Sequence, residues 1–165
     1  MRTIDNINGL NKSEFLSIFG NVFEKTESVA LKVFELKPFK DSDDIVSKML
    51  KIYEEYDKDK ILQILNSHPE LAIEKKLTNE SKLEQTSANL NECSEEEFEE
   101  FKKLNLEYKT KFGFPFIIAV KGKNKNEILV NFRERIQYDL NKEFFEAKNQ
   151  VKKIASFRLK DILSF

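Results

Sequence analysis

The sequence predicts an all-α fold over residues 1–165: a single-domain bundle of about eight helices, with one short extended segment near residues 114–120. Apolar residues recur at three- and four-residue steps through most of the chain, the spacing that places them on one face of a helix. Only four glycines and three prolines interrupt this pattern. With 40% hydrophobic and 12% aromatic residues, the chain has enough apolar surface for one packed core.

Capping residues mark the helices of the first half. Asn11 and Glu14 form a capping box, in which a side-chain oxygen and a carboxylate three residues later satisfy the free amides of a helix start. Phe15, Ile18 and Phe19 then form the apolar stripe of that helix. We expect the further helices of this half at about residues 26–37, 43–56 and 60–66.

The second half of the chain has similar capping signals and one interruption of the helical spacing. Ser94 and Glu97 form another capping box and open a long helix that ends near Gly113, since glycine readily adopts the left-handed conformation that follows a helix. A proline between aromatic residues, followed by two isoleucines, then interrupts the helical spacing and is typical of extended backbone. We expect the last two helices at about residues 125–140 and 142–163.

Composition narrows the classes of function. The 28 Lys and Arg residues nearly balance 29 Asp and Glu, so the net charge of -1 favours neither nucleic acid nor a membrane surface as partner. Cys93 is the sole cysteine, so no internal disulfide is expected, and no apolar run is long enough to cross a bilayer. These features predict a cytoplasmic protein that recognises its ligand at a local site.

His68, the only histidine, is the first candidate for chemistry. Imidazole titrates near neutrality, as proton transfer at physiological pH requires. Pro69 disfavours helical dihedrals at His68, so we expect the imidazole at a helix exit, where it can project into a cleft. The alternative is a structural or exposed histidine. A metal site is not expected, because one His and one Cys leave only carboxylates to complete a ligand set.

A second candidate is the segment from Ser81 to Gln85. On a helix, residues three and four apart share a face, so Ser81, Glu84 and Gln85 can present a hydroxyl, a carboxylate and an amide together. The alternative is a capping box with Ser81 as the cap, and both interpretations can hold at once.

The extended segment is the third candidate. Its peptide groups, which a sheet would normally pair, need partners inside a helical protein, and a flat heterocycle with amide-like edges could supply them. The alternative is a strand that merely crosses the core. Arg158, in the last helix, could contact an anion, although an ordinary ion pair is the favoured interpretation.

Taken together, these motifs resemble the family of 2-oxo-4-hydroxy-4-carboxy-5-ureidoimidazoline (OHCU) decarboxylases, which complete the conversion of urate to allantoin. The resemblance runs from about Leu10 to Leu163. Its landmarks are Lys37-Pro38-Phe39, His68-Pro69-Glu70-Leu71, Ser81 with Glu84-Gln85, Leu104-Asn105 with Tyr108, Lys111 to Ile118, Glu127-Ile128-Leu129 and Arg158-Leu159. Asn89 stands where this family usually has a glycine, and Thr26-Glu27-Ser28 stands where it usually has Ser-Pro-Trp.

The resemblance implies an all-helical enzyme without a cofactor or a metal, whose small-molecule substrate is OHCU. It places the catalytic histidine on His68. Its substrate-contacting residues fall on Pro69, Ser81, Lys82, Leu83, Glu84, Gln85, Phe116, Ile117, Ile118, Ala119 and Val120. The sequence leaves open whether the protein assembles as a homodimer.

The expected reaction is decarboxylation to S-allantoin, in which a carbonyl of the substrate accepts the electron pair left by the departing carboxylate. We expect His68 to orient the substrate and handle the proton, and Glu84 to fix its tautomer or bind the ureido group. Gln85 and backbone amides around residues 117–119 are the expected oxyanion donors. Two alternatives are a non-catalytic ureide-binding module and a cofactor-free lyase or hydrolase acting on a related cyclic ureide.

Overall fold

The computed structural model describes residues 3–72 and 78–164. In this part of the chain every regular element is helical, which confirms the predicted all-α class. The chain divides into two compact units: Met1–Ser67 with Lys152–Phe165, and His68–Val151. The single domain expected over residues 1–165 stays a prediction.

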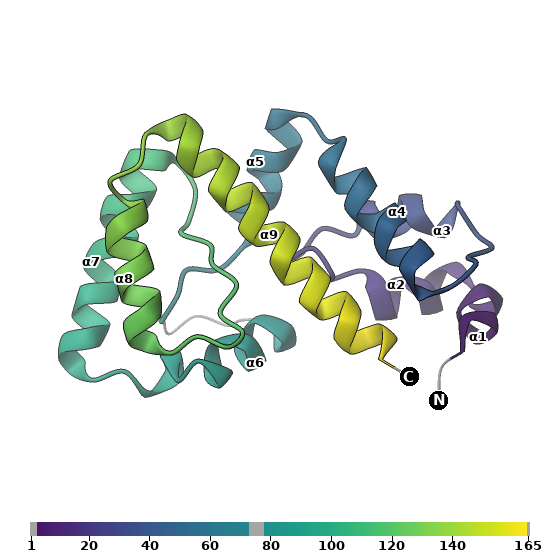
Figure 1. Ribbon diagram of the computed structural model, residues 1–165, viewed down its shortest axis with the longest axis horizontal. Coiled ribbons are helices and arrows are strands. Elements are labelled where there is room, and N and C mark those ends of the chain that lie inside the picture. The colour runs from purple at the N-terminus through teal and green to yellow at the C-terminus, as the bar shows by residue number, and fades with distance from the viewer. Residues whose placement is uncertain (1–2, 73–77, 165) are drawn as a thin grey trace. The chain divides into compact units, whose positions relative to one another are not determined.

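The described residues of the first unit form five helices and the end of a sixth (Figure 1). Capping boxes begin the first two: Thr3 with Asn6, and the predicted pair Asn11 with Glu14. Phe15 packs against the rings of Phe19, Phe34 and Phe39. The helices are α1 (Ile4–Gly9), α2 (Lys12–Phe19), α3 (Ser28–Phe34), α4 (Ser42–Glu54), α5 (Lys58–Ser67) and the second half of α9 (Leu140–Leu163).

The second unit contains the remaining helices. Its longest one is opened by the predicted capping box of Ser94 with Glu97 and is ended by Gly113, whose φ of 79° lies in the left-handed region. The elements are α6 (Asn79–Ser87), the short 3-10 helix η1 (Leu90–Glu92), α7 (Glu95–Phe112), α8 (Lys125–Arg135) and the first half of α9.

Aromatic rings fill the core of the second unit. Phe116, in the extended segment, stacks on Phe132 of α8 with ring centroids 3.9 Å apart. Tyr108 of α7 meets both rings edge-on, at 5.4 and 5.8 Å. Offset-stacked and edge-on pairs of this kind add to the free energy gained by burial alone. The extended segment therefore runs through the core between α7 and α8 rather than over the surface.

Thr78 caps the start of α6, and Asn89 follows its end. The prediction of Ser81 as a helix cap is wrong: Thr78 is the cap, and its side chain accepts a hydrogen bond from the N–H of Ser81. The helix begins one residue after Thr78, so Ser81 lies in its first turn. Asn89 has a φ of 58°, a left-handed conformation that asparagine tolerates better than most residues. It can therefore replace the glycine usual in the family.

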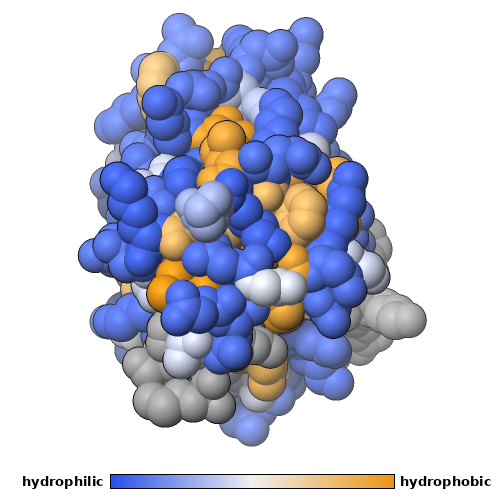
Figure 2. Space-filling model, turned by 90° about the vertical axis from the view of Figure 1, so that its right-hand side faces the viewer, coloured by the Kyte–Doolittle hydropathy of each residue, from blue (hydrophilic) through white to orange (hydrophobic). Residues whose placement is uncertain are grey.

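The face of the molecule drawn in Figure 2 is mostly polar. On the face drawn in Figure 2, hydrophobic residues show in separate groups between polar ones. Among the described residues, no helix combines the length and the apolar composition needed to cross a membrane.

Candidate functional site

His68 lies directly after α5, as predicted for a helix exit, and opens an irregular loop. We call residues 68–72 the histidine loop. His68 is only 8% exposed, and Leu71 and Ala72 are also buried. Pro69 and Glu70 are half-buried. The imidazole is therefore shielded from bulk water, which excludes the exposed histidine that the sequence left open.

Two amide side chains hold the histidine loop. Gln85 of α6 accepts a hydrogen bond from the N–H of Ala72 at 3.1 Å and donates one to the carbonyl of Glu70 at 3.2 Å. Asn105 of α7 donates to the carbonyl of Leu71 at 3.0 Å. The peptide group between Leu71 and Ala72 is thus held at both ends. These bonds also hold Ala72 at a φ of 53°, a left-handed conformation that costs a residue other than glycine roughly 1–2 kcal/mol.

The predicted polar face of α6 is present. Ser81 and Gln85 are buried, and Glu84 is half-buried. Lys82 and Leu83, which the resemblance includes among the substrate contacts, are exposed. Since the oxygen and one N–H of Gln85 hold the histidine loop, only its second N–H is left to act as the predicted oxyanion donor. The sequence did not reveal this loop-holding role.

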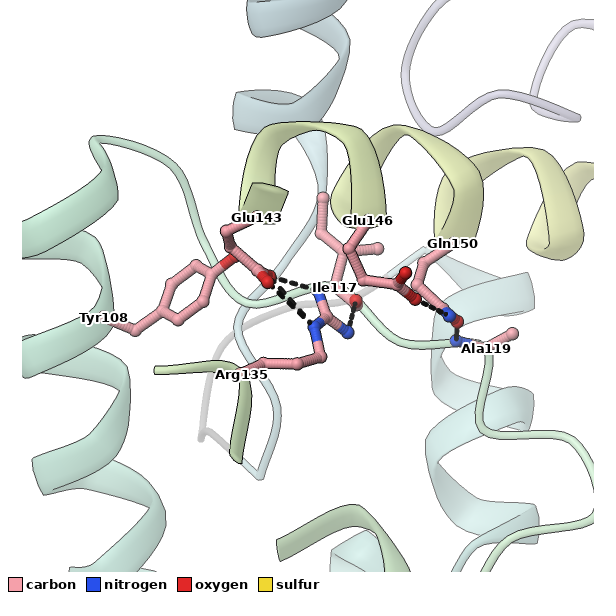
Figure 3. Close-up of polar contacts among 7 residues, drawn as sticks. All are labelled: Tyr108, Ile117, Ala119, Arg135, Glu143, Glu146 and Gln150. Carbon is pink, nitrogen blue, oxygen red and sulfur yellow. Dashed lines mark hydrogen bonds and ion pairs between the residues drawn. The ribbon is translucent and has the colours of Figure 1, made fainter. Parts of the chain in front are cut away.

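Residues 116–120, which we call the core segment, are buried throughout. Figure 3 shows how two side chains hold its backbone. Arg135, at the end of α8, donates to the carbonyl of Ile117 at 2.8 Å, and Gln150 of α9 accepts from the N–H of Ala119 at 2.9 Å. The prediction of Ala119 as an oxyanion donor therefore needs correction, because its N–H is already engaged within the protein.

A buried ion pair supports the core segment through Arg135. Arg135 and Glu143 of α9 are almost fully buried and joined by several hydrogen bonds, one of them at 2.9 Å (Figure 3). The hydroxyl of Tyr108 donates to the same carboxylate at 2.5 Å. Burial, and then the Glu143 charge, raise the pKa of Tyr108, so this hydroxyl stays protonated as a donor. Arg135 also lies 4.3 Å from the centre of the Phe116 ring.

The cluster of Tyr108, Arg135 and Glu143 was not predicted from the sequence. Tyr108 and Glu143 are 35 residues apart, and Arg135 and Glu143 are 8 apart on different helices. No local spacing links them. An available signal was the presence of an arginine and a glutamate at positions that the apolar periodicity places next to buried residues.

Arg158 lies in the first unit, on the second half of α9. It donates to the carboxylate of Glu24 and to the carbonyl of Asn21, both at 2.8 Å. The favoured interpretation as an ion pair is therefore confirmed. A contact between Arg158 and an anionic ligand stays a prediction.

Other features of the second unit do not enlarge the site. A pocket of about 300 Å³ is lined by residues of η1 and of the start of α7, and Ala72 is its only residue from the histidine loop. Within residues 3–72 and 78–164, no group of three or more His, Cys, Asp or Glu side chains is placed to hold a metal ion.

Comparison with known proteins decides the family. The sequence profile described as OHCU decarboxylase matches residues 8–160, nearly the whole chain. The chain belongs to the OHCU decarboxylase family. It is 34% identical to a 2-oxo-4-hydroxy-4-carboxy-5-ureidoimidazoline decarboxylase of Haloferax volcanii, over 98% of this chain and 96% of that protein. It is 33% identical to the protein of that name from Xenopus laevis, over 96% of this chain and 93% of the relative.

Some members of the family are longer. The chain is 38% identical to the uric acid degradation bifunctional protein of Bacillus sp. (strain TB-90) over 98% of its own length, but it spans only 32% of that relative. Among solved structures, it matches the crystal structure of an (S)-allantoin synthase with a TM-score of 0.78 and 26% identity, covering 98% of this chain and 54% of that one. The fold of the family therefore extends over the whole of this chain.

Proposed function

We propose that this chain decarboxylates OHCU to S-allantoin. The observation that carries the proposal is the buried His68 at the start of a loop whose peptide groups are held by Gln85 and Asn105, in a chain that matches the OHCU decarboxylase family from residue 8 to residue 160. An imidazole that is shielded from water, at the start of a loop whose main chain is held at residues 70–72, is suited to transfer a proton to one face of a bound ring.

The chemistry follows from the substrate. When the bond to the carboxylate breaks, carbon dioxide leaves and the electron pair forms a double bond to the ring carbon that carries the ureido group. The C=N bond at that carbon passes its electrons to the ring nitrogen, which takes up a proton, so the hydroxyl-bearing carbon becomes an enol. The enol oxygen then loses its proton and becomes the carbonyl of allantoin, while His68 delivers a proton to the carbon that carries the ureido group. Glu84 lies one helical turn beyond Ser81 on α6, where we expect it to fix the tautomer of His68 or to bind the ureido group. Protonation from one face gives one enantiomer of allantoin.

The hydrogen-bond donors that we assign to the developing oxyanion differ from those predicted from the sequence. The N–H of Ala119 is engaged by Gln150, whereas Ile118 forms no hydrogen bond through its N–H or its carbonyl with the described residues. Ile118 is only 4% exposed. We therefore assign the donor role to the N–H of Ile118 and to the remaining N–H of Gln85.

The test is a direct assay. OHCU is generated freshly from urate, the protein is added, and circular dichroism follows the allantoin that forms. We expect an optically active product that forms faster than in the absence of protein. Racemic product at the spontaneous rate would contradict the proposal, and ureide binding without turnover would identify a binding module instead.

The same proposal includes the location and assembly of the enzyme. We place it in the cytoplasm, where the single Cys93 stays a free thiol, as it is in the structure. For the homodimer, sedimentation at several protein concentrations gives the answer: a mass of twice 19.4 kDa supports it, and a constant mass of 19.4 kDa contradicts it.

A further inference from the structure

The peptide groups on either side of Ile118 are both fixed by side chains of other helices. Arg135 holds the carbonyl of Ile117, and Gln150 holds the N–H of Ala119 (Figure 3). In a planar trans peptide group, the carbonyl and the following N–H point in opposite directions. The N–H of Ile118 must therefore point away from Arg135, and the carbonyl of Ile118 must point away from Gln150.

The amide of Gln150 is itself held in one orientation. Its nitrogen donates to the carboxylate of Glu146, one turn earlier on α9, at 2.7 Å. A carboxylate only accepts hydrogen bonds, so Glu146 fixes which end of the amide is nitrogen. The oxygen of Gln150 is then the end that faces Ala119. Gln150 is buried, with 7% exposure, so water competes little for these bonds.

This orientation of the Gln150 amide bears on the main chain of Ile118, which lies between the two engaged peptide groups. Within the described residues, neither the N–H nor the carbonyl of Ile118 has a hydrogen-bond partner. Buried main-chain polar groups are nearly always paired, and an unpaired one costs about 1–3 kcal/mol. A ligand with amide-like edges removes this cost, because it supplies both a donor and an acceptor.

We propose that Gln150 is a positioning residue for substrate binding: by holding the N–H of Ala119, it aims the carbonyl of Ile118 at an N–H of the ureide. This inference rests on the proposed function and adds a residue outside the predicted site. Gln150 does not touch the substrate. It acts through one peptide group, and Glu146 acts through Gln150.

Three variants test the inference. Gln150→Leu removes the acceptor, and Gln150→Glu places two carboxylates one turn apart, so the pair loses its hydrogen bond. The double variant Glu146→Gln/Gln150→Glu restores the chain of hydrogen bonds, because the carboxylate introduced at position 150 accepts from Ala119 and from the amide introduced at position 146. Asn149→Leu, at the exposed neighbouring position of α9, is the control for a change on the same helix.

Gln150→Leu should raise KM for OHCU by about 10- to 100-fold, with kcat changed less than about threefold, since the carbonyl of Ile118 binds ground and transition state alike. Gln150→Glu should raise KM by less, because its carboxylate still accepts from Ala119 although the charge of Glu146 repels it. The double variant should return KM to within about threefold of the wild type, and Asn149→Leu should not change it. Unchanged KM in folded Gln150→Leu, or no recovery in the folded double variant, would overturn the inference. A loss confined to kcat would also contradict it.

Two readouts separate this inference from the function. In the ligand-free protein, the amide proton of Ala119 should shift upfield in Gln150→Leu and return in the double variant. If the wild type does not turn over OHCU, the proposed function fails. Titration with S-allantoin, followed by the amide resonance of Ile118, then still tests positioning: weaker binding in Gln150→Leu supports it, and equal binding refutes it.

Discussion

The histidine loop and the core segment are both irregular, and both are held by side chains from neighbouring helices, but they are held in different ways. Neutral amides hold the loop and engage both ends of one peptide group, between Leu71 and Ala72. The core segment is held by a buried arginine and by Gln150, which engage one end each of two successive peptide groups.

The difference assigns a separate task to each region. In the histidine loop, the carbonyls of Glu70 and Leu71 and the N–H of Ala72 are engaged within the protein, and we expect the loop to offer the side chain of His68 to a ligand. In the core segment, the apolar side chains pack in the core, and the segment presents peptide groups that have no partner among the described residues, those of Ile118 included. The loop therefore supplies chemistry and the segment supplies recognition.

The variant His68→Asn tests whether the histidine loop supplies the chemistry, and we expect it to have the largest effect. If the loop supplies the proton, this variant should lose about 10²- to 10⁴-fold in kcat, because that is the typical contribution of an acid or base group. Its free energy of unfolding and its KM should change little. Steady-state kinetics and urea unfolding give both quantities. Near-normal kcat in the folded variant would remove His68 from the mechanism.

Glu143→Gln tests the ionic support of the core segment. The variant leaves Arg135 buried without a charged partner, which typically costs about 3–5 kcal/mol. We expect a loss of about that size in the free energy of unfolding, measured with urea. Glu107→Gln is the matched control, since Glu107 is half-exposed and 3.9 Å from Lys103, and should cost at most about 1 kcal/mol. Equal losses in both variants would contradict the buried ion pair.

Gln85→Leu tests the neutral support of the histidine loop. It leaves the N–H of Ala72 buried without its acceptor, so the free energy of unfolding should fall by about 1–3 kcal/mol, less than for Glu143→Gln. The activity should fall as well, because the loop would no longer hold His68 in place. A variant with full activity would show that the loop does not need this anchor.

The smallest expected effect concerns Glu97, a half-buried carboxylate at the start of α7 that pairs with Lys125 of α8. Hydrogen bonds from the Ser94 backbone and from Lys125 hold the pKa of Glu97 below its ordinary value. This group therefore stabilises the fold above its ordinary pKa, and the contribution is lost as the pH falls toward the lowered value. Glu97→Gln should be less stable than the wild type at pH 7, and the difference should disappear once the pH falls below the lowered pKa of Glu97. A difference that persists at low pH would contradict this account.

Local signals in the sequence were sufficient for much of the fold. The boxes of Asn11 with Glu14 and of Ser94 with Glu97 act within one turn, so their spacing predicts them reliably. Ser81 failed as a cap because Thr78, three residues earlier, satisfies the same helix start. The helix α1 was not predicted, and the prediction that the helix at 125 continues to 140 was too long, since α8 ends at Arg135.

The candidate site, like the fold, could be predicted from the sequence only where the signal is local. The sequence identified His68, Ser81 and Gln85 as polar residues in a helical protein, and all three are buried. It could not show that Gln85 holds the loop, or that Gln150 reaches a peptide group 31 residues away. Such bonds depend on tertiary packing, which the periodicity of a single helix does not specify.

A crystal structure of the protein soaked with S-allantoin tests the central claim most directly. The account predicts a single ureide that pairs with the N–H and carbonyl of Ile118 and lies within hydrogen-bond distance of His68 and Glu84. Allantoin bound elsewhere, with both polar groups of Ile118 still unpaired and the imidazole remote from the ring, would contradict it.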